Sequence, residues 1–260
     1  MEDEARLSAN KGRASLVIGA SSAIAQAIIQ HLIHPFDSAK VKGSNRYHRV
    51  IGLTQKEPRD LIQDPNVTYL KTDYSEQSLS KHFQDQRERL SQCDQAFICN
   101  GLLHLDTAMP EKSMSSINEK YFSALMRANA FVPLFCLSQL KSVLPKTSEC
   151  KITVFSARIG SISDNRSGGW YAYRSSKAAL NMGLKTASIE LARSHPKVKL
   201  LAFHPGTTNT PLSKPFQARV PKDKLFTPEY VAQQLFALLA KASPEQSIAF
   251  MDWNHQSIDW

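Results

Sequence analysis

Two side chains that can act together as a proton donor and a fixed positive charge lie four positions apart, at Tyr173 and Lys177. They belong to the run Tyr171-Ala-Tyr173-Arg-Ser-Ser-Lys177-Ala-Ala-Leu180, which has the pattern of a helix start. A spacing of four places both side chains on one helix face. A neighbouring ammonium group favours the phenolate and makes a phenol useful for proton transfer near neutral pH. The pair also occurs by chance on exposed helices, so its meaning depends on the elements that position it.

Those elements alternate between short apolar strands and helices along the chain. Strands that are apolar on both faces and separated by helices are typical of an α/β fold with a parallel, doubly wound sheet. The expected strands are Ser15–Ile18, Arg49–Leu53, Val67–Leu70, Gln95–Cys99, Lys151–Phe155, Val198–Phe203 and Ser247–Met251. The expected helices are Ile24–Ile33, Leu79–Leu90, Ile117–Leu144 with an interruption near Pro133, Ala172–Arg193 and one that begins at Thr227.

The length of 260 residues suits one such domain. No linker divides the sequence, so we expect a single domain at 13–260 after a flexible tail at 1–12. No apolar run is long enough to cross a bilayer, and the charged N-terminus lacks the apolar stretch of a secretory signal. The four cysteines have no Cys-x-x-Cys spacing and are expected to be reduced. We therefore expect a cytoplasmic protein without a metal site.

The chain is basic, with a formal net charge of +9 and a pI near 9.4. Its lysines and arginines are scattered, apart from a local concentration at 40–49. Scattered charge is more typical of a solvated surface than of a nucleic-acid site, and no motif with interleaved aromatic residues is present. We expect neither nucleic acid nor a membrane as a partner.

Polar and glycine-bearing turns follow five of the expected strands. Ligands of a parallel sheet bind beyond the carboxyl ends of its strands, so these turns should meet at one edge. The first turn opens a helix, where backbone N–H groups can face a pyrophosphate. The turns are Gly19-Ala-Ser-Ser-Ala23-Ile-Ala25, Asp73-Tyr74, Asn100-Gly101, Ser156–Gly160 and His204-Pro205-Gly206.

With Tyr173, Lys177 and Asn129, these turns resemble the short-chain dehydrogenase/reductase family over nearly the whole chain. Within that family the chain looks most like the C-factor-like and Sniffer-like carbonyl reductases, and the run from Gly160 to Lys177 is especially similar to the C-factor subgroup. The resemblance implies a Rossmann fold and a nicotinamide cofactor.

The resemblance also implies a role for each matched position. Tyr173 would donate a proton to the substrate carbonyl, Lys177 would hold the nicotinamide ribose and lower the Tyr173 pKa, and Asn129 would hold a water. A helical asparagine can instead bond to a nearby backbone carbonyl, and Asp73 can instead be a turn residue. The residues expected at the cofactor are Gly19, Ser21, Ser22, Ala23, Ile24, Thr54, Gln55, Lys56, Asp73, Tyr74, Asn100, Gly101, Tyr173, Lys177, Pro205, Gly206 and Thr207.

The chain departs from the family pattern in two places. Ala23 and Ala25 stand where the first turn would carry glycines, so the turn must admit two methyl groups. Ala157 stands where a serine would orient the substrate carbonyl. Losing one donor to a transition state can cost on the order of a hundredfold in rate. Ser156 and Ser161 are the neighbouring hydroxyls that can replace it, and Ser156 is placed in the expected catalytic set.

The cofactor choice rests on the end of the second strand. An acidic residue there would bind a ribose 2′-hydroxyl and favour NAD, but this strand leads into Thr54-Gln55-Lys56. Thr54, Lys56 and Arg46 can instead accept a 2′-phosphate. We therefore expect NADP rather than NAD, although the same side chains can simply face water.

The expected function is an NADP-dependent oxidoreductase that reduces a small aldehyde or ketone, with the segment 210–226 folded over the substrate. The alternative is a dinucleotide-binding signalling or regulatory protein with little turnover, which Ala157 and the alanine-bearing first turn favour. A scaffold without dinucleotide affinity is a third possibility. In the family, the helices that carry Asn129 and Tyr173 form a dimer interface, so we expect a homodimer or homotetramer.

Overall fold

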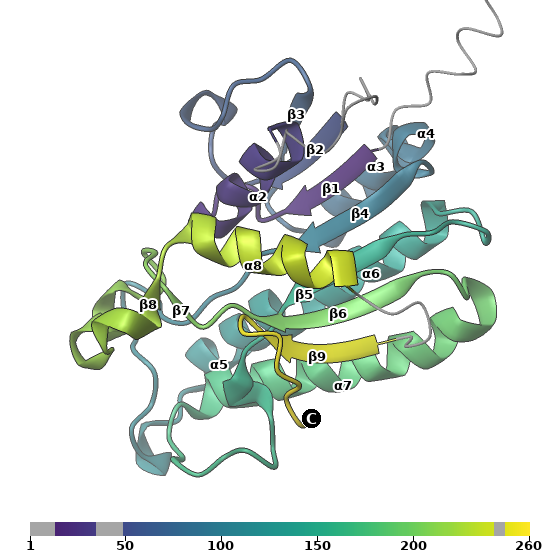
Figure 1. Ribbon diagram of the computed structural model, residues 1–260. Helices are drawn as coiled ribbons and strands as arrows, with labels where there is room; N and C mark the ends of the chain where they lie inside the picture. Colours follow the sequence, from purple (N-terminus) through teal and green to yellow (C-terminus); the bar gives the residue numbers. More distant parts are fainter. Residues whose placement is uncertain (1–13, 35–48, 242–247) are drawn as a thin grey trace, which may run out of the picture.

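The computed structural model describes residues 14–34, 49–241 and 248–260. Seven strands form one parallel sheet in the order β3-β2-β1-β4-β5-β6-β9 (Figure 1). This confirms the expected doubly wound α/β fold. The order reverses between β1 and β4, which is where such sheets bind ligands. The strands are β1 (Ala14–Ile18), β2 (Arg49–Thr54), β3 (Val67–Lys71), β4 (Cys93–Ile98), β5 (Lys151–Phe155), β6 (Lys199–His204) and β9 (Ile248–Asp252).

Helices cover both faces of the sheet (Figure 1). On one face α2 (Ala23–Ile33) packs beside α8 (Pro228–Lys241). The other face carries α3 (Glu76–Asp85), α4 (Arg87–Leu90), α6 (Val132–Val143) and the long α7 (Tyr171–Ser194), with α5 (Glu119–Met126) packed on α7.

Each strand contributes to two hydrophobic cores because successive side chains point to opposite faces. In β1, Leu16 and Ile18 belong to the core under α6 and α7, whereas Val17 belongs to the core under α2 and α8. All three side chains are fully buried. This two-sided burial explains why the strand reads as an uninterrupted apolar run.

One expected helix is interrupted where the sequence pattern runs on, and another is interrupted near Pro133, as expected. The helix expected at 79–90 begins earlier and breaks at Gln86, giving α3 and α4. The helix expected at 117–144 contains a π-helical turn at Arg127–Phe131, just before Pro133, which lacks the N–H that a regular turn would use.

The segment after β6 forms a small addition that the strand pattern did not predict. Strands β7 (Thr207–Thr208) and β8 (Leu225–Phe226) pair in parallel and close the loop between them. That loop carries short 3₁₀ turns at Lys214–Arg219 and Lys222–Lys224. The pairing holds this part of the expected covering segment next to the carboxyl edge of the sheet.

Some expectations fall outside the described residues, namely the tail at 1–12, Arg46 and the first residue of the last expected strand. Within the described ranges, no helix combines the length and apolar character that crossing a membrane requires.

Candidate active site

The turn after β1 is held tightly against the end of β4. Gly19 has a φ of +75°, and a Cβ there would lie 2.7 Å from the Asn100 backbone nitrogen. Any side chain would be both strained and blocked, so this position requires glycine. Ser22 then caps α2 by accepting a 3.2 Å hydrogen bond from the Ala25 N–H. The turn therefore places the N-terminus of α2 near the ends of β1 and β4, where the strand order of the sheet reverses.

The two alanines that replace glycines in this turn leave the helix N-terminus open. Ala25 is fully buried in the core under α2 and α8, so its methyl group points into the protein. Ala23 and Ser21 are half-buried at the turn itself. The first N–H groups of a helix have no partner within it and favour an anion. The turn therefore fits a pyrophosphate despite its missing glycines.

The neighbouring Tyr74 supports this turn from inside. Its hydroxyl accepts a 3.1 Å hydrogen bond from the Gly19 N–H and donates one of 3.2 Å to the Leu53 carbonyl. Burial is the main effect on the Tyr74 phenol and raises its pKa. The ring packs against the core under α6 and α7, so the side chain braces β1 against β2.

The turns after β2 and β3 present the remaining expected cofactor residues. Thr54 is fully buried, and its hydroxyl accepts a 3.0 Å hydrogen bond from the Lys56 N–H. Gln55 and Lys56 are exposed. Asp73 is exposed and accepts a 2.8 Å hydrogen bond from the Ser75 N–H, which lowers the pKa of its carboxyl. Of this group, Gln55, Lys56 and Asp73 face solvent, whereas the Thr54 hydroxyl is used within its own turn.

Lys177 lies beneath the crevice at the end of β4. Its side chain is 3% exposed, and its Nζ donates a 2.9 Å hydrogen bond to the Phe155 carbonyl. A Cβ built on Gly101 would lie 3.7 Å from that Nζ. Burial lowers the pKa of the ammonium group to about 8. A buried amine with spare donors beside a glycine is well suited to bind ligand hydroxyls.

Asn129 sits within the π-helical turn, and its side-chain amide is occupied. Its Oδ1 accepts a 2.7 Å hydrogen bond from the Leu102 N–H. Its Nδ2 donates to the Leu102 carbonyl at 2.8 Å and to the Ser176 Oγ at 3.0 Å. The amide therefore ties the loop after β4 to α7. A water held by Asn129 would have to use its backbone carbonyl or the second lone pair of Oδ1.

Tyr173 lines a pocket of about 230 Å³ beside this crevice. Burial, the largest effect, raises the pKa of its phenol, and Tyr121 adds to the rise. The lowering expected from Lys177 is therefore not the dominant effect in the free protein. The pocket gathers several residues of the expected site from the starts of α2 and α7 and from the segments after β5 and β6, namely Ile24, Tyr173, Ser156, Pro205, Gly206 and Thr207.

Neither of the two serines that could replace the hydroxyl missing at Ala157 is free to face the substrate beside Tyr173. Ala157 lines the pocket at the position where the family carries serine. Ser156 also lines it, but its Oγ donates a 2.6 Å hydrogen bond to the buried Asn181 Oδ1. Ser161 is 2% exposed, lies within 3.3 Å of the Ser163 hydroxyl and does not belong to the described pocket lining. A catalytic role for Ser156 would require its bond to Asn181 to break.

Residues 13–221 match the family described as short chain dehydrogenase. This chain belongs to that family. It is 26% identical over 254 residues to 1-hydroxy-2-glutathionyl-2-methyl-3-butene dehydrogenase of Rhodococcus sp. (strain AD45), covering 94% of this chain and 98% of that protein. It is 33% identical over 132 residues to C-signal of Myxococcus xanthus, covering 51% of this chain and 74% of that protein.

Solved structures of the family share the fold. The NADPH-bound carbonyl reductase from chicken fatty liver has a TM-score of 0.78 at 22% identity, with 96% of this chain and 99% of that chain covered. The carbonyl reductase Sniffer of D. melanogaster has a TM-score of 0.76 at 16% identity, with 96% and 100% covered. The resemblance to the C-factor and Sniffer groups that the motifs indicated is thereby confirmed.

In this short-chain dehydrogenase, we expect Ala157→Ser to raise turnover. A hydroxyl on this pocket wall would add a donor for the substrate oxygen, and one such donor is worth on the order of a hundredfold where its geometry is good. Steady-state kcat of the variant with a carbonyl substrate measures the effect. Ala157→Gly is the control, because it changes the same position without adding a hydroxyl. Equal or lower turnover in the serine variant would show that another group already fills this role.

Several residues that line this pocket were not predicted from sequence. Trp170 and Phe216 line the pocket with their rings 5.0 Å apart. The one signal in the sequence was the bulky Trp170 between two glycines and Tyr171. Leu103 and Thr208 were also not predicted, whereas Ile159 and His204 belong to the expected turns, and Thr210, Leu212, Ser213 and Phe216 to the expected covering segment at 210–226.

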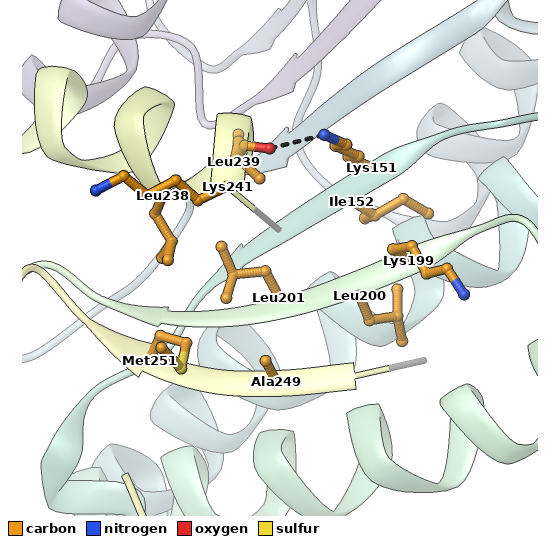
Figure 2. Close-up of a pocket in the computed structure, with 10 residues that line it drawn as sticks. All are labelled: Lys151, Ile152, Lys199, Leu200, Leu201, Leu238, Leu239, Lys241, Ala249 and Met251. Carbon is orange, nitrogen blue, oxygen red and sulfur yellow. Dashed lines mark hydrogen bonds between the residues drawn. The ribbon is translucent and has the colours of Figure 1, made fainter. Parts of the chain in front are cut away.

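A second cavity, of about 190 Å³, lies away from Tyr173, between α8 and the strands β5, β6 and β9 (Figure 2). Leucines form much of its wall, and three lysines stand around it. Lys151 bonds to the Leu239 carbonyl at 2.7 Å, while the ammonium groups of Lys199 and Lys241 point away in opposite directions (Figure 2). Because the three charges do not converge, this cavity is not organised as an anion site.

Proposed function

We propose that this protein reduces a small aldehyde or ketone to the alcohol with NADPH as the reductant. The observation that carries the proposal is the position of Tyr173 in the wall of a pocket, four residues from the buried Lys177 at the carboxyl edge of the sheet. The bound nicotinamide supplies the hydride. The Tyr173 hydroxyl supplies the proton to the carbonyl oxygen, and Lys177 holds ribose hydroxyls through its free donors.

The protonation of Tyr173 favours the reducing direction. A proton donor must carry its proton at the working pH, and burial holds the phenol in that form by raising its pKa. Oxidation of an alcohol would need the phenolate, which the same burial disfavours. We therefore expect carbonyl reduction near neutral pH and alcohol oxidation only at higher pH.

The remaining expected residues hold the dinucleotide in this proposal. The turn at 19–24 and the N-terminus of α2 face the pyrophosphate, and Asn100 and Gly101 lie against the ribose. Asp73 meets the adenine from its exposed position, with Tyr74 behind it as a brace rather than a direct contact. Pro205, Gly206 and Thr207 border the nicotinamide at the mouth of the Tyr173 pocket. The NADPH-bound carbonyl reductase of the same fold supports NADPH as the dinucleotide.

The preference for NADP rests on Lys56, which is exposed at the end of β2. We expect Lys56→Ala to weaken NADPH binding roughly tenfold and to leave NADH binding unchanged, because one charge-assisted contact to the 2′-phosphate is lost. Fluorescence titration with both dinucleotides measures this. Lys81→Ala is the matched control, since Lys81 pairs with Asp85 on α3. An equal loss for both dinucleotides would remove Lys56 from the 2′-phosphate site.

The direct test is NADPH oxidation by the purified protein in the presence of a broad panel of aldehydes and ketones. Turnover that depends on the carbonyl compound supports the proposal. Tight NADPH binding without turnover would instead favour the second candidate, a dinucleotide-binding regulatory protein. That candidate rests on Ala157, which leaves the pocket wall without its expected hydroxyl. Absence of any dinucleotide affinity would exclude both.

Self-association through α6 and α7 belongs to the same proposal. Phe131, the last residue of the π-helical turn before α6, is 41% exposed, and Met182 on α7 is 67% exposed. Leu184, which also suits close packing, is instead fully buried in its own core. We propose that the exposed apolar side chains form the homodimer contact, which sedimentation of the purified protein would test.

A further inference from the structure

The Tyr173 pocket has an aromatic wall that runs from the reacting hydroxyl to the covering segment. The Trp170 ring lies 6.2 Å from the Tyr173 ring in an edge-on arrangement and 5.0 Å from Phe216. Phe216 lies on the 3₁₀ turn at Lys214–Arg219 and is 6.1 Å from the His104 ring. Trp170 therefore joins the catalytic helix to the segment that covers the pocket.

The backbone of Trp170 is held in a conformation that tryptophan rarely adopts. Its φ is +52°, in the left-handed region, and it directly precedes α7. Such a conformation costs on the order of 1 kcal/mol and persists only where the surroundings enforce it. Gly168 and Gly169, which also have positive φ, lead the chain into it. A bulky residue fixed at this cost beside a reacting group indicates a function for the ring.

Glu111 enforces this conformation. Its backbone carbonyl accepts a 2.6 Å hydrogen bond from the Trp170 N–H. Its carboxylate accepts from the Ala172 N–H at 3.2 and 3.3 Å, in the first turn of α7. Glu111 is 3% exposed, although it is an acidic residue from the loop after β4. The side chain thus caps the catalytic helix, which has no capping side chain of its own.

The rest of the pocket combines apolar side chains with the neutral hydroxyl residues Ser156, Thr207, Thr208, Thr210 and Ser213, and carries no fixed charge among its described lining residues. Leu103, Ile159 and Leu212 form the other walls. His204 is the one titratable lining group besides Tyr173 in the described chain, and burial lowers its pKa to about 4, so it is neutral at pH 7. The nearby Arg158 is held by Asp164 and Asp252 at 3.1 and 2.9 Å. A charged substituent would therefore lose its hydration without gaining an opposite charge among the described lining residues.

We propose that Trp170, positioned by Glu111, is the specificity-determining wall of this pocket, and that it selects carbonyl compounds bearing an uncharged, flat, apolar substituent. The inference rests on the proposed function, because it describes the substrate class of the same site. A flat ring packs against Trp170 and Phe216 while its carbonyl oxygen faces the Tyr173 hydroxyl. A saturated ring of similar size cannot make this face-to-face or edge-on aromatic contact with the two side chains.

The test compares three aldehydes of the same framework: benzaldehyde, cyclohexanecarboxaldehyde and 4-carboxybenzaldehyde. With the wild-type protein and NADPH, we expect kcat/KM for benzaldehyde to exceed the other two by about tenfold. Trp170→Ala should raise the KM for benzaldehyde by about tenfold and abolish its advantage over the saturated aldehyde. Glu111→Ala, which keeps the backbone bond to Trp170 but removes the carboxylate that caps α7, should lower the preference for benzaldehyde to a smaller extent, and Glu111→Gln, which keeps an acceptor for the Ala172 N–H, should restore part of it.

Controls separate this specificity from folding and from the proposed function. NADPH affinity should be unchanged in all three variants, because none of them lies at the dinucleotide turns. Glu119→Gln, the same charge change at an exposed site on α5, should alter nothing. A second readout needs no turnover: acetophenone should quench the tryptophan fluorescence of the NADP⁺-loaded wild type but not of Trp170→Phe.

The outcomes are distinct. If the wild-type protein neither binds NADPH nor turns over any carbonyl compound, the proposed function is overturned. Turnover of all three aldehydes with equal kcat/KM, or an unchanged preference in Trp170→Ala, would overturn the specificity inference and leave the reductase proposal standing. A preference for the carboxylated aldehyde would show that a cation reaches the pocket and would also overturn it.

Discussion

Tyr173→Phe should lower kcat for carbonyl reduction by a factor of about 10² to 10⁴, the range that a positioned proton donor contributes. The substitution removes one oxygen atom from a side chain that lines the pocket and leaves the ring in place against Trp170. NADPH binding should be retained, because the main dinucleotide contacts come from other turns. Single-turnover oxidation of NADPH with benzaldehyde measures the loss, and fluorescence titration measures the retained affinity.

Tyr171→Phe is the matched control for this substitution. Tyr171 lies in the same first turn of α7, two residues away, but it is six residues from Lys177 and does not belong to the described pocket lining. Its variant should keep nearly full activity. If both phenylalanine variants lost activity equally, or if Tyr173→Phe kept the wild-type rate, the phenol of Tyr173 would not be the proton donor.

The parts of the fold that sequence could predict are those in which local pattern and burial agree. The strand at Lys151–Phe155 was predicted to the residue, because an apolar run there is buried on both faces. The start of α8 also follows from local chemistry, since the Thr227 hydroxyl accepts a hydrogen bond from the Tyr230 N–H. The helix expected at 79–90 broke at Gln86, where no proline or glycine marks the break. Periodicity reports which faces are buried, and it is insensitive to such local breaks.

The parts of the site that sequence could not supply depend on contacts between distant loops. Glu111 and Ala172 lie 61 residues apart, and nothing in the acidic residue's own neighbourhood indicates that it caps α7. The Tyr74 hydroxyl bonds to the Gly19 N–H, which lies 55 residues away in the sequence. Sequence alone therefore could not distinguish this bracing role of Tyr74 from a direct contact with the cofactor. The order of the motifs along the sequence predicted that the turns meet at the carboxyl edge of the sheet. The use of each side chain within the crevice follows only from the packed structure.

Lys177→Met should reduce kcat/KM for carbonyl reduction by about a hundredfold or more, because a preorganised positive charge beside the reacting phenol and the ribose is lost. Methionine keeps much of the volume of the buried side chain, so the core around it is retained. Lys185→Met is the control on the same helix, where the lysine is exposed. A variant at position 177 that kept wild-type kcat/KM would remove the ammonium group from the mechanism.

The same pair of variants also tests the burial of this charge through the pH dependence of stability. The Lys177 pKa is about 8 in the folded protein, against 10.5 for an ordinary lysine. Between these values the unfolded chain binds more protons than the folded one, so the free energy of unfolding rises with pH. From pH 7 to pH 10.5, denaturant titrations should therefore show the wild type gaining on the order of 3 kcal/mol relative to Lys177→Met. Below about pH 8 the Lys177 contribution is flat, since both states hold the proton. The Lys185→Met protein should follow the wild-type curve, and a Lys177→Met curve parallel to it would show that the ammonium group is hydrated in the folded protein.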